Sequence, residues 1–177
     1  MRLLLAALAL ATFGSPAEAW QSTHATAQEA TADVILSGRV VDEADLLPES
    51  AERRLTEKLA ALEEATTDQM VVVTLESLRG ATIEDVAFEL GNRWGIGRAD
   101  VDNGVLLIIA AEEGRVRIAV GSGLEGLLTD ERATAIVNDM MPKFEADRPI
   151  DAIDTGVTEV DRLLRSDSRR PQYRKAA

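Results

Sequence analysis

Apolar and polar residues follow two periods along the chain, one typical of strands and one of amphipathic helices. Short, mainly apolar runs at 39–41, 70–75 and 105–110 predict strands, and the longer runs at 70–75 and 105–110 indicate strands covered on both faces. Residues 116–120 alternate, and the turn at 112–114 pairs them back onto the preceding strand.

Between the strands, apolar residues recur at helical spacing and predict four helices. Pro48 suits a helix start, Thr82 caps a second helix with Asp85 at the capping-box position, and Thr129 caps a third. A last helix is expected over 150–164. The inner faces are Leu55, Leu59 and Leu62; Ile83, Val86, Ala87, Leu90 and Trp94; Ile136, Val137, Met140, Met141 and Phe144; and Ile153, Val157, Val160 and Leu164. The order β-α-β-α-β-β-α-α predicts an α/β fold with a small mixed sheet between helical layers.

Both ends of the chain lack this periodicity. Arg2, the apolar run 3–13 and the small-x-small pattern Ala17-Glu18-Ala19 predict a cleavable signal peptide over 1–19, cut after Ala19. Its apolar run is too short to span a membrane, and no later run reaches that length, so we expect a periplasmic or secreted protein without a transmembrane anchor. Residues 20–37 are expected to be a flexible leader, 38–164 one folded domain, and 165–177 a basic disordered tail.

Charge and missing residue types narrow the chemistry. Residues 38–164 hold 27 Asp and Glu against 13 Lys and Arg, a balance that repels nucleic acid and anionic lipid and attracts cations. Most of these acids are expected to serve solubility. The chain has no Cys, and its one His, His24, lies in the leader, so triads and zinc sites built on these residues are excluded from the folded domain. The remaining oxygen ligands suit Ca²⁺ or Mg²⁺.

Three of these oxygen ligands are expected at one end of the sheet. Asp102 and Asn103 enter the first strand of the hairpin, the glycine loop 121–126 leaves its second, and Asp130 starts a nearby helix. They could hold a cation, although a turn and a helix start also account for the same residues. Asp42 falls at the opposite end if the strands are parallel, and joins them only if the first strand is antiparallel.

Several ordered motifs resemble the TPM domain family, which is named for a thylakoid lumen protein, a photosystem II repair factor and a nematode receptor modulator. The motifs are Val40-Val41-Asp42 with Leu46-Leu47, Val71-Val72-Val73-Thr74, Trp94-Gly95-Ile96-Gly97, Asp102-Asn103-Gly104-Val105-Leu106-Leu107, Val120-Gly121-Ser122-Gly123-Leu124-Glu125-Gly126, Leu128-Thr129-Asp130 and Pro142-x-Phe144. The resemblance covers about 38–164.

The resemblance implies a three-layer αβα sandwich in a periplasmic, luminal or cell-surface protein. It implies Asp42, Asp102, Asn103 and Asp130 as candidate metal ligands, with Trp94, Gly97, Gly104, Gly121 and Gly123 shaping the site. Some members bind Ca²⁺ or Mg²⁺, some hydrolyse phosphoesters, and others are accessory factors of membrane complexes. Trp94 is also explained by packing in the core.

Two functions are consistent with these residues. The first is a calcium-binding accessory or interaction module for envelope proteins, without catalysis. The alternative is a metal-dependent, acid-phosphatase-like enzyme in which Asp42 or Asp130 acts as base. Arg98 is the nearest cation to the ligand motifs that a phosphate would need.

Overall fold

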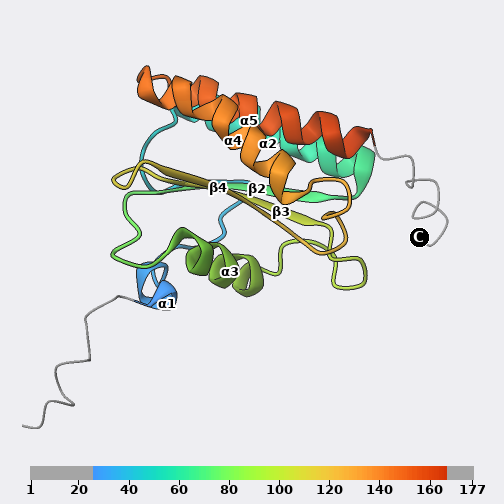
Figure 1. The fold of residues 1–177 in the computed structure, drawn as a ribbon, viewed down its shortest axis with the longest axis horizontal. Coiled ribbons are helices and arrows are strands. Elements are labelled where there is room, and N and C mark those ends of the chain that lie inside the picture. Colours follow the sequence, from blue (N-terminus) through green and yellow to red (C-terminus); the bar gives the residue numbers. More distant parts are fainter. Residues whose placement is uncertain (1–25, 167–177) are drawn as a thin grey trace, which may run out of the picture.

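The chain forms a four-stranded mixed sheet with helices on both faces (Figure 1). The computed structural model describes residues 26–166, so the expected signal peptide and most of the basic tail lie outside the described residues. The strands are β1 (Val40–Asp42), β2 (Gln69–Leu75), β3 (Gly104–Ala110) and β4 (Arg115–Val120). They lie in the order β1-β2-β3-β4, with β1, β2 and β3 parallel and β4 antiparallel to β3.

The helices are α1 (Ala27–Ala30), α2 (Glu49–Thr66), α3 (Ile83–Trp94), α4 (Asp130–Glu145) and α5 (Pro149–Arg165). Figure 1 shows α2, α4 and α5 on one face of the sheet and α1 and α3 on the other. The three-layer αβα sandwich expected from the sequence is therefore confirmed. None of the helices within 26–166 is long and apolar enough to cross a membrane.

Two apolar cores lie on the two faces of the sheet, and strand alternation divides residues between them. On β2, Met70 and Val72 pack under α2 and α5, whereas Val71, Val73 and Leu75 pack against α3. Both faces are buried, which is why β2 reads as a continuous apolar run. The predicted stripes of α2 and α5 are fully buried.

The described part of the expected leader is ordered against α3. Thr26 caps α1 and accepts a hydrogen bond from the Glu29 amide. Ala30 is buried, and Arg93 donates hydrogen bonds to the carbonyl oxygens of Thr31 (2.8 Å) and Val34 (3.1 Å). Residues 26–34 therefore differ from the flexible segment expected from their composition, because α3 supplies apolar and cationic partners that a local pattern does not reveal.

The parallel strands give the sheet two chemically distinct ends. We call the end where β2 and β3 begin and β4 finishes the Asp102 end, and the opposite one the Asp42 end; the Asp102 end lies on the right in Figure 1. The loop 95–103 and the glycine loop 121–126 both lie at the Asp102 end. Arg165 at the end of α5 bonds the Ala61 carbonyl near the end of α2, so α5 also finishes there.

Candidate functional site at the Asp102 end

Two loops cross at the Asp102 end in direct backbone contact. A Cβ on Gly104 would overlap the Ile96 carbonyl, and one on Gly121 would overlap the Asp102 carbonyl. Gly123 is equally close to the Val101 carbonyl, and its amide donates to the Asp102 carbonyl at 3.0 Å. Gly121 and Gly123 therefore let the glycine loop approach the loop 95–103, and Gly104 lets Ile96 lie against the start of β3.

Asp102 joins the two loops through its side chain. Its backbone is in the left-handed region (φ 46°), which Asp tolerates better than most residues, and its Oδ2 accepts a hydrogen bond from the Ser122 amide at 2.8 Å. Hydrogen bonds from the Ser122 side chain and amide hold the pKa of Asp102 below its usual value. Asp102 is exposed, so the site presents a stable negative charge to solvent.

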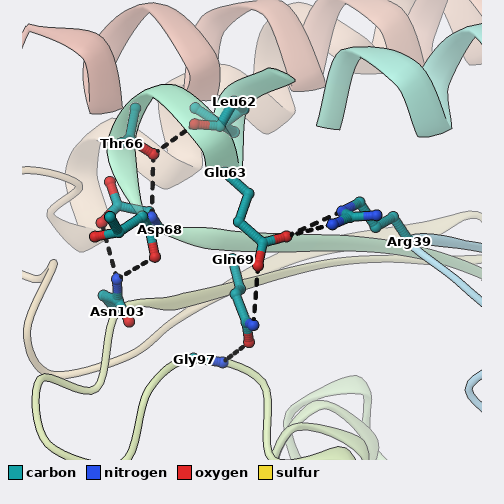
Figure 2. A network of polar contacts seen from close by, with 9 residues as sticks. Arg39, Leu62, Glu63, Thr66, Asp68, Gln69, Gly97 and Asn103 are labelled. Atoms are coloured by element: carbon teal, nitrogen blue, oxygen red, sulfur yellow. Dashed lines mark hydrogen bonds and ion pairs between the residues drawn. The ribbon is translucent and has the colours of Figure 1, made fainter. Parts of the chain in front are cut away.

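The Asn103 side chain forms hydrogen bonds within the fold rather than facing solvent (Figure 2). It is only 5% exposed. Its Nδ2 donates to the Thr67 carbonyl (2.7 Å) and to Asp68 (3.1 Å), and its Oδ1 accepts from the Arg98 amide (2.9 Å). The side chain expected to supply a metal ligand is therefore buried, and its hydrogen bonds join the loop 95–103 to the end of α2.

A second network of polar contacts also holds the loop 95–103, and it extends across the sheet to β1. Gln69 accepts from the Gly97 amide (2.8 Å) and donates to Glu63 (3.2 Å), which also pairs with Arg39 at 2.7 Å (Figure 2). Trp94 is half-buried against the α3-side core and lines a separate depression beside Arg39 and Gln69. Trp94 thus packs beside the site rather than lining it.

Asp42 does not share this site. β1 is parallel to β2, with Asp42 paired to Thr74, so Asp42 lies at the Asp42 end of the sheet. Its carboxylate accepts the amides of Leu46 (3.2 Å) and Leu47 (2.8 Å) and the Thr74 hydroxyl. The parallel pairing therefore excludes Asp42 from a common ligand set with Asp102, and its carboxylate closes the turn that leads into α2.

Asp130 is the first residue of α4 and is exposed. Thr129 caps the helix by accepting the Arg132 amide at 3.4 Å. The glycine loop brings α4 to the Asp102 end, as expected, but no hydrogen bond joins Asp130 to Asp102 within the described chain.

An open depression of about 290 Å³ lies between α3 and the glycine loop, and we call it the Asp102 depression. Its polar lining includes Asn92, Asp102, Ser122 and Glu125, and Phe88 of α3 borders it. Among its described lining residues there is no Lys or Arg. Asp130 is not part of this lining.

The four predicted ligands do not fit one metal ion, because Asp42 is at the other end of the sheet and the Asn103 side chain is buried and hydrogen-bonded within the fold. Within 26–166, no group of three or more His, Cys, Asp or Glu side chains is arranged to hold a metal. Two carboxylates, Asp102 and Glu125, share the depression, and hydroxyl and carbonyl oxygens lie beside them. This set suits at most a weakly held, largely hydrated divalent cation.

Two residues of the site were missed by sequence reasoning. Glu125 lies within the glycine loop, whose position after a strand at the Asp102 end was the available signal. Phe88 lies outside the apolar stripe of α3, and a large aromatic residue on the polar side of a helix was the signal there.

The comparisons with known proteins agree with this fold. A model of the TPM domain matches residues 40–163. The solution structure of the N-terminal domain of a protein from P. gingivalis is 32% identical, with a TM-score of 0.69, and the match covers 79% of this chain and 91% of that one. No curated protein matches the chain.

Two further solved structures share the fold at lower identity. The N-terminal domain of the cg2496 protein from Corynebacterium glutamicum has a TM-score of 0.59 at 17% identity, covering 76% of this chain and 86% of that one. The BA42 protein from Bizionia argentinensis has a TM-score of 0.60 at 18% identity, covering 68% and 83%.

Proposed function

The chain belongs to the TPM domain family, and from this premise we propose that it is an exported, non-catalytic accessory module that binds through the Asp102 depression. The depression holds a divalent cation, Ca²⁺ or Mg²⁺, weakly and presents a negatively charged surface to envelope proteins. Export is supported by the signal-peptide pattern from Arg2 to Ala19.

The lining of the depression is the observation that carries this proposal. Asp102 and Glu125 place two carboxylates on one concave surface, and the hydrogen bonds from Ser122 keep Asp102 ionised. Oxygen ligands of this kind suit hard cations, and two carboxylates match the weak, millimolar range of extracellular calcium modules, on the order of 10⁻⁴–10⁻³ M.

The phosphatase alternative has less support from the same geometry. A phosphoester carries negative charge, and none of the described residues that line the depression is a Lys or Arg. Arg98, the nearest cation in the sequence, pairs with Asp100 at 3.1 Å. Neither candidate base lies in the depression. Asp42 is at the opposite end of the sheet, where its carboxylate accepts the Leu46 and Leu47 amides, and Asp130 is not among the residues that line the depression.

Calcium titration by calorimetry tests the proposal. Asp102→Asn with Glu125→Gln removes two charges while keeping side-chain shape, and we expect the heat of binding to disappear. The matched control is Glu57→Gln with Asp139→Asn, which removes two exposed charges from α2 and α4 on the other face and should leave the titration unchanged.

Three results would contradict the proposal. The first is equal calcium binding by the double variant and the wild type. The second is loss of binding on Asp130→Asn alone, which would move the site to α4. The third is hydrolysis of a chromogenic phosphate monoester that depends on the metal and on Asp102, which would make the protein an enzyme.

A further inference from the structure

The exposed aromatic ring of Phe88 stands between two depressions on the α3 side of the molecule. Phe88 is 76% exposed, more than Ile35 (72%) and Leu36 (39%), the other exposed large apolar residues of the described chain. On one side lies the Asp102 depression, and on the other a wider one of about 740 Å³ between α1 and the start of α3. Phe88 lines both.

The charged residues that line the two depressions beside Phe88 are all acidic. The wider depression carries Asp85 and Glu89, and the Asp102 depression carries Asp102 and Glu125. No Lys or Arg is among the described residues that line either one. Arg117 of β4 contacts α3, where its guanidinium pairs with Glu84 at 3.2 Å.

The position of Phe88 has no structural explanation within the fold. The core face of α3 is made by Ile83, Val86, Ala87 and Leu90, which are all buried. Phe88 contributes neither to this face nor to the core cluster beneath it. A large apolar side chain in water, bordered by concave surfaces and acidic side chains, has the composition of an interface anchor with a charged rim.

We propose that Phe88 and its two depressions form a docking surface for a basic segment of a partner protein that alternates Lys or Arg with large apolar side chains. The apolar side chains pack against Phe88, and the cationic ones reach Asp85 and Glu89 on one side and Asp102 and Glu125 on the other. The charge complementarity selects this occupant, because an acidic segment or an anionic lipid surface would be repelled. This inference rests on the proposed function, since it names the partner class for the same depression.

A labelled peptide that alternates lysine and leucine is the probe, with fluorescence anisotropy as the readout. We expect Phe88→Ala to weaken its binding by about tenfold or more, as truncation of an aromatic anchor does. Phe88 is exposed and Ala is a better helix former, so the variant should stay folded. The control Ile35→Ala removes a similarly exposed apolar side chain and should leave the affinity unchanged.

Charge is tested with the variants used for calcium. Asp102→Asn with Glu125→Gln should weaken peptide binding severalfold and reduce its dependence on salt, whereas Glu57→Gln with Asp139→Asn should not. Replacing lysine by glutamate in the peptide should abolish binding, and replacing leucine by serine should remove the difference between wild type and Phe88→Ala.

Several outcomes overturn the inference. Equal affinity of the wild type and Phe88→Ala would show that net charge alone binds the peptide. An equal loss of peptide affinity in Asp102→Asn with Glu125→Gln and in Glu57→Gln with Asp139→Asn would also show that net charge alone binds the peptide. Self-association of the wild type that Phe88→Ala abolishes would assign the surface to a second copy of this chain. Calcium titration separates the two proposals. Phe88→Ala should bind calcium like the wild type while losing affinity for the peptide. If the wild type binds no calcium, the calcium proposal fails and the peptide result still tests the docking surface.

Discussion

Asn103 provides the sharpest test of the site, because its side chain either binds a metal ion or stabilises the fold through its hydrogen bonds. We predict that Asn103→Ala destabilises the fold and that Asn103→Asp does so more strongly. The carboxamide makes three hydrogen bonds, to the Thr67 carbonyl, to Asp68 and from the Arg98 amide. In the alanine variant, each of these three partners loses its hydrogen bond to the side chain at position 103.

The magnitude follows from the exposure of these partners. A net hydrogen bond contributes about 1 kcal/mol, and one to a charged group about 1.5–3 kcal/mol. Asp68 is only 7% exposed, whereas water can reach the half-buried Thr67 and the exposed Arg98. We therefore expect Asn103→Ala to lower the free energy of unfolding by about 3 kcal/mol.

Asn103→Asp keeps the acceptor for Arg98 but replaces the donating amide by a carboxylate oxygen. That oxygen would face the Thr67 carbonyl and the Asp68 carboxylate at the 2.7 and 3.1 Å of the present hydrogen bonds. Two charges so close repel by about 5 kcal/mol at an effective dielectric constant near 20. The loss of stability should shrink as the pH falls and one carboxylate becomes protonated.

Urea unfolding followed by circular dichroism measures both variants. Asn138→Ala, on the exposed side of α4, is the control and should stay within about 0.5 kcal/mol of the wild type. A loss below about 1 kcal/mol for Asn103→Ala would refute the structural role. An Asn103→Asp variant that is stable and binds calcium more tightly would restore Asn103 as a ligand.

Three further predictions concern the core, the loop crossing and the pH dependence. Leu59→Ala empties a fully buried position of α2 and should cost about 3–5 kcal/mol in urea unfolding, whereas a cost below about 1 kcal/mol would contradict its place in the core. Gly104→Ala places a Cβ on the Ile96 backbone and should cost about 1–3 kcal/mol, with a neutral result arguing against the close approach of Ile96 to the start of β3. Asp102 has a lowered pKa in the folded protein, so it stabilises the fold above its unfolded pKa of about 4 and this contribution is lost as the pH falls through the folded value. The difference in unfolding free energy between the wild type and Asp102→Asn should therefore shrink in acid, and a difference that grows there would contradict the Ser122 hydrogen bonds as its cause.

The site was predictable in part. The hairpin of β3 and β4 follows from their two apolar runs and the turn between them, so the meeting of Asp102 with the glycine loop could be inferred. The same reasoning left Asp42 open, because the direction of β1 depends on how α2 packs across the sheet. The use of the Asn103 side chain was hidden because its partners come from the end of α2, 36 and 35 residues away along the chain.

The sequence by itself determined the elements from β1 to α5, their order and the faces they bury. Periods of two and 3.6 residues are local properties, and an apolar stripe on a strand or helix leaves water only by packing on that face. It also determined the family, through motifs that occur in order from Val40 to Phe144. The tertiary structure alone decided which polar side chains face inward and which face solvent. Asn103 and Asp42 form hydrogen bonds with backbone groups that folding brings close to them. Asp102, Glu125 and Phe88 instead line one concave surface. A motif lists the polar atoms of a site, but only their distances to the rest of the chain show which remain available to a ligand.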